Sequence, residues 1–297
     1  MIEPCRTHAR ATGARKVLRA VTVIGLLVTV AAAPAVRAQA PDVQGSSSGV
    51  LLTGRDLALF GAATLGSAAL TRLDARMANA LYDSLFQVNH PGITSAANRA
   101  SLMTETLLML TGGTVWGIAR LRHDDGTADV ALHTTEAIAS TAMFIQVVRG
   151  ALGRGRPYVV NEVGEKRNGD PYEFQFLHGF TSYNYRSWPS MHAMANFAAA
   201  SALSAEMRQR NTPNRAIISP VLFLGATLPS LARMYLDEHW VSDIAMGAFL
   251  GVFAGQKAVN YSHDHPGNIV DRKLLRPAVR ATFTHDARGL SFAITPY

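Results

Sequence analysis

Apolar residues along this chain gather in six runs, separated by polar segments that contain Gly or Pro. Ala, Leu and Met dominate the runs, and none alternates between apolar and polar positions as a half-buried strand does, so each run predicts a helix. We therefore expect an all-α fold with a six-helix core bundle. Further short helices are expected in the connection 72–100, around residues 76–83. The six runs cover residues 57–71, 106–119, 137–148, 193–205, 216–232 and 244–256.

The C-terminal segment, residues 263–297, has a different pattern. Apolar and polar residues alternate on both sides of a polar turn at 286–289, which predicts a short β-hairpin accessory to the bundle. The run His263-Asp264-His265 at the start of this segment could bind a metal, but the Pro266-Gly267 pair that follows it favours a solvated loop.

Residues 1–38 have the pattern of a signal peptide. Basic residues precede the apolar run 20–33, and small residues at 36–40 offer cleavage sites. We expect an exported, periplasmic protein in which a flexible linker, residues 39–52, leads into a helical domain at residues 53–262. An uncleaved anchor helix is the alternative reading of the N-terminus. Against it, Pro34 and Arg37 end the apolar run before it reaches the roughly 20 residues of a membrane span.

The net charge of +7 comes mainly from this signal segment, which holds six Lys or Arg residues and one Glu. Without the segment the net charge is +2, and the sequence has no basic stripe with interleaved aromatic residues, so we expect no nucleic-acid partner. The one cysteine, Cys5, also lies in the segment. A mature chain would therefore have no disulfide, no cysteine nucleophile and no cysteine metal ligand.

The uncharged runs are about 12 to 17 residues long, shorter than the 18 or more that mark a membrane span. We therefore expect a periplasmic domain with a possible membrane association. A protein integral to the inner membrane is the alternative, because three arginines in one loop, at 208, 210 and 215, would suit a cytoplasmic loop.

The candidate chemistry begins with His239 and Asp243, which stand four residues apart. On a helix this spacing puts both side chains on one face, where the carboxylate can orient the imidazole as it does in catalytic triads. Arg233, just upstream, offers a planar cation suited to phosphate oxygens. Asp237 and Glu238 are expected to be solvated charges.

Two earlier stretches carry matching residues. In the first, Arg149 and Arg156 flank glycines at 150, 153 and 155, which are expected to end a helix, while Arg154 is expected to face solvent. In the second, Ser190 is expected to be a helix N-cap, followed by Met191 and His192, and a helix N-terminus is a favourable place for phosphate. A serine, two histidines, three arginines and a carboxylate are suited to holding an anionic tetrahedral group and transferring it. Aromatic and His residues at 178, 183, 185 and 188 could line a pocket, although packing is the more usual role.

The three stretches together resemble the signature of the type 2 phosphatidic acid phosphatase superfamily, which includes bacterial class A acid phosphatases and vanadium haloperoxidases. The matching blocks are Arg149 with six residues before Arg156-Pro157; Pro189-Ser190-Met191-His192; and Arg233, five residues, His239, three residues, Asp243. Three positions depart from the family pattern. Arg149 stands where the family most often has Lys, which keeps the positive charge. Ala232 replaces a Ser, and Met191 replaces a Gly whose N–H Met can still supply if its φ is negative.

The resemblance implies the family's helical fold and a phosphatase that forms a phosphohistidine. His239 would attack phosphorus, Asp243 would orient it, and His192 would protonate the leaving oxygen. Arg149, Arg156 and Arg233 would bind the phosphoryl group together with the backbone N–H groups near Ser190 and Met191, with no metal or other cofactor.

In membrane members of the family the site faces outward. If the N-terminus here is exported and three helices then span the membrane, Arg156 in the first motif would lie on the cytoplasmic side. This conflict with the family orientation again favours a periplasmic domain.

The implied substrate is a phosphomonoester or diphosphate, either a lipid phosphate or a small soluble phosphomonoester. Two alternatives stand beside the phosphatase. One is a non-catalytic domain that binds phosphate or lipid headgroups, and the other is a vanadium-dependent haloperoxidase.

Overall fold

The structure is a computed structural model that describes residues 52–82, 84–160, 166–274, 279–286 and 289–296. The signal peptide predicted at residues 1–38, and the predicted linker up to residue 51, lie outside the described residues.

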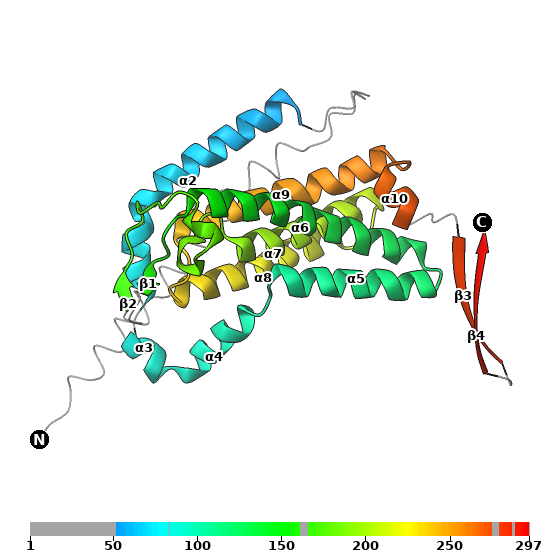
Figure 1. The fold of residues 1–297 in the computed structure, drawn as a ribbon, viewed down its shortest axis with the longest axis horizontal. Coiled ribbons are helices and arrows are strands. Elements are labelled where there is room, and N and C mark those ends of the chain that lie inside the picture. Colours follow the sequence, from blue (N-terminus) through cyan, green and yellow to red (C-terminus); the bar gives the residue numbers. More distant parts are fainter. Residues whose placement is uncertain (1–51, 83, 161–165, 275–278, 287–288, 297) are drawn as a thin grey trace, which may run out of the picture.

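All six apolar runs form helices, so the all-α prediction is confirmed, and every helix is longer than its run (Figure 1). The apolar runs mark only the uninterrupted apolar part of each helix, and neighbouring polar, charged and isolated apolar residues extend the helices beyond them. The six helices are α2 (Gly54–Leu81), α5 (Glu105–Leu121), α6 (Asp125–Leu152), α7 (Met191–Gln209), α8 (Arg215–Tyr235) and α9 (Val241–Asp264).

Capping side chains set where these helices begin. Thr53 and Asp56 form a reciprocal capping box at the start of α2, and Ser190 accepts a hydrogen bond from the backbone N–H of Ala193 at the start of α7. At the other end of α6, Gly153 has a φ of 62° and a Cβ there would lie 1.7 Å from the Gln175 carbonyl oxygen, so glycine ends the helix as expected.

The short helices of the 72–100 connection are not where the sequence placed them. Residues 76–81 continue α2, because helix formers at these positions prolong it after its apolar run ends. The short helices are α3 (Ser84–Asn89) and α4 (Pro91–Ala100), and α4 begins at a proline in the first helical position. One more short helix, α10 (Ile269–Leu274), follows α9.

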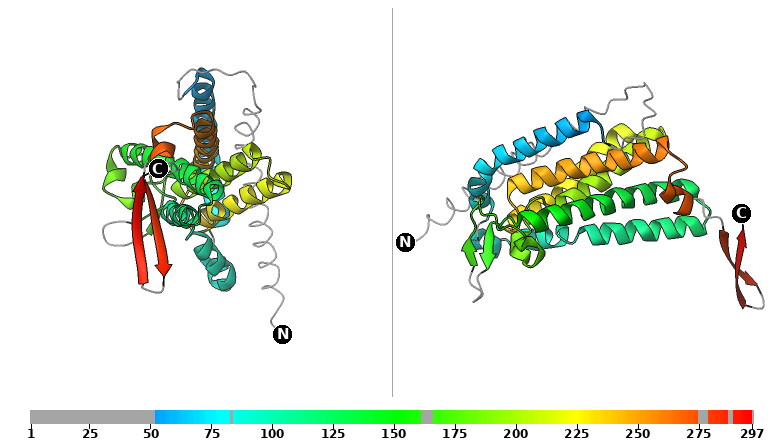
Figure 2. Two further views of the ribbon diagram at one scale, coloured as in Figure 1. Left: turned by 90° about the vertical axis from the view of Figure 1, so that its right-hand side faces the viewer. Right: turned by 45° about the horizontal axis from the view of Figure 1, so that its top comes forward.

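Helices α7 and α9 are parallel neighbours at the centre of the bundle, held close by Gly247, Gly251 and Gly255 on α9. A Cβ on Gly247 would lie 2.4 Å from the Ser190 carbonyl oxygen, and one on Gly251 would lie 2.3 Å from that of Met194. This close approach brings the N-termini of the two helices together, where a backbone bond of 3.1 Å joins Ser190 N to Asp243 O. Figure 2 shows α2 running alongside α9 on the outside of this pair.

Gly251→Ala is expected to destabilise the protein by about 1–3 kcal/mol, because a methyl group against a backbone oxygen forces the two helices apart. Gly225→Ala on α8 is the matched control. A Cβ there meets nothing within 4 Å, so this variant should be more stable than wild type by up to about 1 kcal/mol, the difference in helix propensity between Gly and Ala. Urea unfolding of both variants measures the difference, and equal stability of the two would contradict this packing.

Apolar side chains also cover much of the outer surface of the bundle. On α8, Ile217, Val221, Leu224 and Leu228 recur at helical spacing, and each is more than half exposed. Among the described helices, α8 is the one that is long and apolar enough to cross a membrane by length and composition. A contiguous exposed apolar face is typical of a surface that contacts a membrane or another protein.

Two hairpins complete the described chain. Strands β1 (Tyr158–Val160) and β2 (Lys166–Asn168) pair between α6 and α7. Strands β3 (Val279–Asp286) and β4 (Gly289–Pro296) pair in antiparallel register, as the alternation predicts, and extend beyond the end of the bundle that carries α10 (Figures 1 and 2).

Candidate functional site

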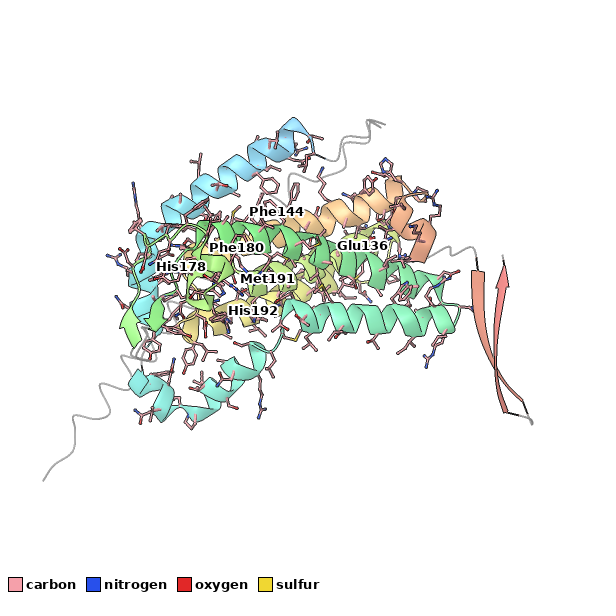
Figure 3. All side chains as sticks on the ribbon, viewed as in Figure 1. Glu136, Phe144, His178, Phe180, Met191 and His192 are labelled. Carbon is pink, nitrogen blue, oxygen red and sulfur yellow. The ribbon has the colours of Figure 1, made fainter. Side chains whose placement is uncertain are left out.

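Four helix ends meet at one end of the bundle. The C-termini of α6 and α8 bring Arg149 and Arg233, and the N-termini of α7 and α9 bring His192 and Asp243. Figure 3 shows Met191 and His192 in this region, near the short helix η1 (His178–Phe180). Because the N-terminus of a helix carries a partial positive charge and free N–H groups, this end of the bundle favours an anion.

Asp243 is fully buried and orients His239. Its Oδ2 atom lies 3.4 Å from His239 Nδ1, and it accepts hydrogen bonds from Trp240 N at 2.8 Å and Ser187 Oγ at 2.5 Å. Burial raises the pKa of Asp243, but Arg154 and His239 outweigh that effect and hold the pKa below its ordinary value. Asp243 is therefore a carboxylate, and it can accept a hydrogen bond from the Nδ1–H group of the His239 imidazole.

His239 is 4% exposed, and its pKa is lowered to about 3 by burial and by the positive charges of Arg156 and Arg233. The ring is therefore neutral over the physiological pH range. With Nδ1–H donated to Asp243, the lone pair stays on Nε2, which is the form a nucleophilic histidine needs.

Arg154, predicted to face solvent, is instead among the most buried side chains, with 1% exposure. Its guanidinium donates to Asp243 at 2.6 Å, to Asp74 at 2.7 Å and to Ser242 Oγ at 2.7 Å. Burial and the nearby charge of Asp243 raise the pKa of Asp74 to about 6. The arginine turns inward because αL Gly153 reverses the chain after α6, so Arg154 supports the site from behind rather than facing solvent.

Glu238 is also misplaced by the sequence analysis, which expected a solvated charge. Its Oε2 atom lies 3.0 Å from Arg156 Nη1 and 2.9 Å from Arg233 Nη2. Tyr183 OH donates to the same oxygen at 3.2 Å, and Tyr158 OH donates to Oε1 at 3.0 Å. The carboxylate of Glu238 is therefore paired with both arginines.

The two arginines keep further capacity for an anion. Arg156 is 2% exposed, and its guanidinium lies 4.1 Å from the centre of the Tyr183 ring. Arg233 is 9% exposed, and its Nε is buried without a hydrogen-bond partner among the described residues. Because an unpaired buried donor is costly, a phosphoryl oxygen bound there would be favoured.

The other predicted residues surround this centre less tightly. Arg149 is half-buried and donates to Gln146 on its own helix at 2.9 Å; burial lowers its pKa, and the charge of Arg156 lowers it further. His192 Nε2 lies 3.2 Å from the Ser101 carbonyl oxygen, and burial and Arg233 lower its pKa to about 4. Ser190 caps α7, and the Met191 side chain packs into the hydrophobic core. Among the described residues no hydrogen bond joins Arg149 or His192 directly to His239, Arg156 or Arg233.

The sequence did not reveal the roles of four residues that support the site. Tyr183 was noted only as an aromatic residue in a loop, and Glu238 only as a charge beside the histidine. Asp74 and Ser187 gave no signal, because their partners lie 80 or 56 positions away along the chain. Among the described residues, the groups with metal-ligand spacing centre on His133 and contain none of these site residues.

Comparison with known proteins places the candidate site within a family match. Residues 131–265 match the model of the PAP2 superfamily, a range that contains the three motifs from Arg149 to Asp243. No curated protein matches the chain. A solved structure with some similarity is the first transmembrane PAP2 type phosphatidylglycerolphosphate phosphatase from Bacillus subtilis, at 15% identity and a TM-score of 0.37, over 69% of this chain and 96% of that one. The family match therefore covers residues 131–265, the part of the chain that carries the candidate site, and over these residues the chain is similar to the PAP2 superfamily.

Proposed function

We propose that this chain is a phosphatase that hydrolyses a phosphomonoester or diphosphate through a phosphohistidine on His239. The observation that carries the proposal is the environment of one neutral imidazole. Asp243 faces its Nδ1 at 3.4 Å, and the charges of Arg156 and Arg233 act on the same ring. The match of residues 131–265 to the PAP2 superfamily supports a phosphatase in general.

In the first step His239 Nε2 attacks phosphorus, and the bond from phosphorus to the ester oxygen breaks. His192 donates a proton to the departing oxygen, and the developing charge is stabilised by Arg149, Arg156 and Arg233. The bound phosphoryl group offsets the charge of Arg233, which otherwise lowers the pKa of His192, so substrate binding favours the protonated acid.

In the second step His192 accepts a proton from water, whose oxygen attacks phosphorus and breaks the bond to Nε2. Phosphate leaves, and His239 returns to its neutral form. The arginines supply the positive charge that metal ions supply in other phosphoryl transfers, so no step of this scheme uses a metal. The N–H groups at the start of α7, near Ser190 and Met191, add donors for the phosphoryl oxygens.

The substrate class we propose is a lipid phosphate, hydrolysed by a periplasmic domain at a membrane surface. The support is the exposed apolar face of α8 and the similar residues on α5, which include Leu110 and Leu121. A phosphorylated lipid keeps its chains among apolar groups while its headgroup reaches the arginines. Export depends on the predicted signal peptide, and a small soluble phosphomonoester is the competing substrate.

Phosphate release tests this proposal. The mature chain, with EDTA present, is given vesicles that contain phosphatidic acid or a lipid diphosphate, and separately a small aryl phosphate. We expect turnover in EDTA and a preference for the lipid. Turnover of the aryl phosphate alone would overturn the lipid assignment. No turnover from any compound, with phosphate still bound, would instead identify a non-catalytic domain, a role that the occupation of both arginines by Glu238 would suit.

Glu238→Gln is expected to tighten inhibition by inorganic phosphate by about tenfold. The substitution removes a negative charge that competes for Arg156 and Arg233, and a tenfold change corresponds to about 1.4 kcal/mol. Asp237→Asn is the matched control, since it removes a negative charge from the residue before Glu238. Asp237 has a φ of 62°, which Asn also tolerates. Weaker phosphate inhibition in Glu238→Gln would show that Glu238 orients the arginines rather than competing for them.

A further inference from the structure

A second cluster of polar side chains lies at the opposite end of the bundle from the phosphatase site. His133 is about 24 Å from Arg149 along α6, at 1.5 Å per residue. The cluster joins α6 to α7 through Glu206, to α9 through His263 and to α10 through Asp271. Figure 3 labels Glu136, which belongs to it, on the part of α6 that lies towards α10.

Two atoms in this cluster are buried and lack hydrogen bonds. His133 is 3% exposed and Asp271 is 5% exposed, and His133 Nε2 lies 3.5 Å from Asp271 Oδ1. Neither atom has a hydrogen-bond partner among the described residues. An unsatisfied buried polar atom costs about 1–3 kcal/mol, so two that face each other call for a shared partner.

The spacing of these atoms fits one metal ion. Ligand atoms at about 2.0–2.2 Å from a tetrahedral zinc ion lie about 3.4 Å from one another, close to the 3.5 Å seen here. A carboxylate oxygen of Glu136, one turn further along α6, completes a group in which all ligand atoms lie within 4.8 Å of one another. One imidazole and two carboxylates are ligands that zinc accepts.

Glu206 contacts one ring nitrogen of His133 and leaves the other nitrogen facing Asp271. The His133 Nδ1 atom lies 2.6 Å from Glu206 Oε1, so donation of Nδ1–H to Glu206 leaves the lone pair on Nε2. Glu206 is in turn fixed by Arg210 Nε at 2.9 Å and lies 3.2 Å from His263 Nε2. A carboxylate behind a ligating histidine is the usual outer shell of a protein metal site.

Charge points the same way. Glu206 and Asp271 are buried and Glu136 is half-buried, so three carboxylates lie close together here, and Asp129 shares the Arg210 side chain with Glu206. Buried carboxylates need a compensating cation, and a divalent ion between Glu136 and Asp271 would supply it.

We propose that His133, Glu136 and Asp271 bind one divalent transition-metal ion of the zinc class, and that this ion fastens α10 to α6. The ion would act structurally, remote from His239, and would fix the segment from which the C-terminal hairpin extends. Phosphate release would not require it.

The test uses the mature full-length chain, stripped with EDTA, dialysed, and titrated with zinc chloride by calorimetry at pH 7.5. We expect one ion per chain and a rise in melting temperature on zinc addition. Asp271→Asn should weaken zinc binding by more than the roughly 10- to 100-fold that outer-shell changes cost, and should remove the rise. Asp264→Asn, an exposed carboxylate at the end of the neighbouring helix, should leave both unchanged.

Cobalt provides a readout that needs no variant. Addition of Co²⁺ to the stripped wild-type chain should give the visible absorption of a tetrahedral site, and zinc should displace it. Absence of this spectrum, or zinc binding that is equal in wild type and Asp271→Asn, would overturn the proposal. A protonated His133 would then bridge the two carboxylates without an ion.

Discussion

Replacement of His239 by Ala is expected to lower kcat for phosphate release by at least about 10⁴-fold, because the substitution removes the nitrogen that we propose attacks phosphorus. Asp243 keeps its bonds to Arg154, Ser187 and Trp240 N in this variant, so the site does not lose its buried carboxylate. Initial rates with saturating substrate measure the effect, and circular dichroism checks that the variant is folded.

His178→Ala is the control for His239→Ala. His178 is an exposed histidine on η1 that contacts Gln175 and stacks on Tyr185, near the site but outside the proposed chemistry. We expect its rate to stay within a few-fold of wild type. A His239→Ala variant that keeps more than a tenth of wild-type kcat would contradict the assignment of the nucleophile.

Replacement of Arg154 by Met is expected to destabilise the protein by about 3–5 kcal/mol, the usual cost of breaking a buried ion pair. The guanidinium links Asp74 on α2 to Asp243 on α9, and Met would leave two buried carboxylates without their cation. Activity should fall as well, since Asp243 would lose the charge that keeps its pKa low. Urea unfolding gives the free energy of unfolding.

Arg120→Met provides the surface comparison for Arg154→Met. Arg120 pairs with Asp125 at 2.7 Å, but the Asp125 side chain is 78% exposed, so its loss should cost less than about 1 kcal/mol. If Arg154→Met costs no more than Arg120→Met, the buried network does not hold the site together. Arg154→Lys keeps a charge and should fall between the two.

Much of the fold could be predicted from local pattern alone. Helices α7 and α9 contain nearly continuous runs of small and apolar residues, and their position at the centre of the bundle follows from that composition. Helix ends were predicted less well. The charged residues Asp74 and Arg76 were read as part of a connection, whereas α2 continues through both of them to Leu81.

Within the site, contacts between sequence neighbours could be predicted, and contacts between distant residues could not. His239 and Asp243 are close, at 3.4 Å, as predicted, but His239 lies just before the Trp240 N-cap of α9 rather than on the helix, so the contact comes from the turn into α9. Arg154 and Glu238 instead depend on partners about 80 positions away, Asp74 and Arg156, which no local spacing reveals. His263 was placed in a solvated loop, yet it lies in the last turn of α9 beside Glu206, since α9 runs on to Asp264.

Trapping of the phosphoenzyme tests the central claim most directly. The mature chain is mixed with a substrate whose phosphoryl group carries ³²P, quenched in alkali within the first turnovers, and digested for peptide mapping. The account predicts a label that is stable to alkali, lost in acid and carried by the peptide that contains His239. Phosphate release without any such label, or with the label on another residue, would contradict a phosphohistidine at His239.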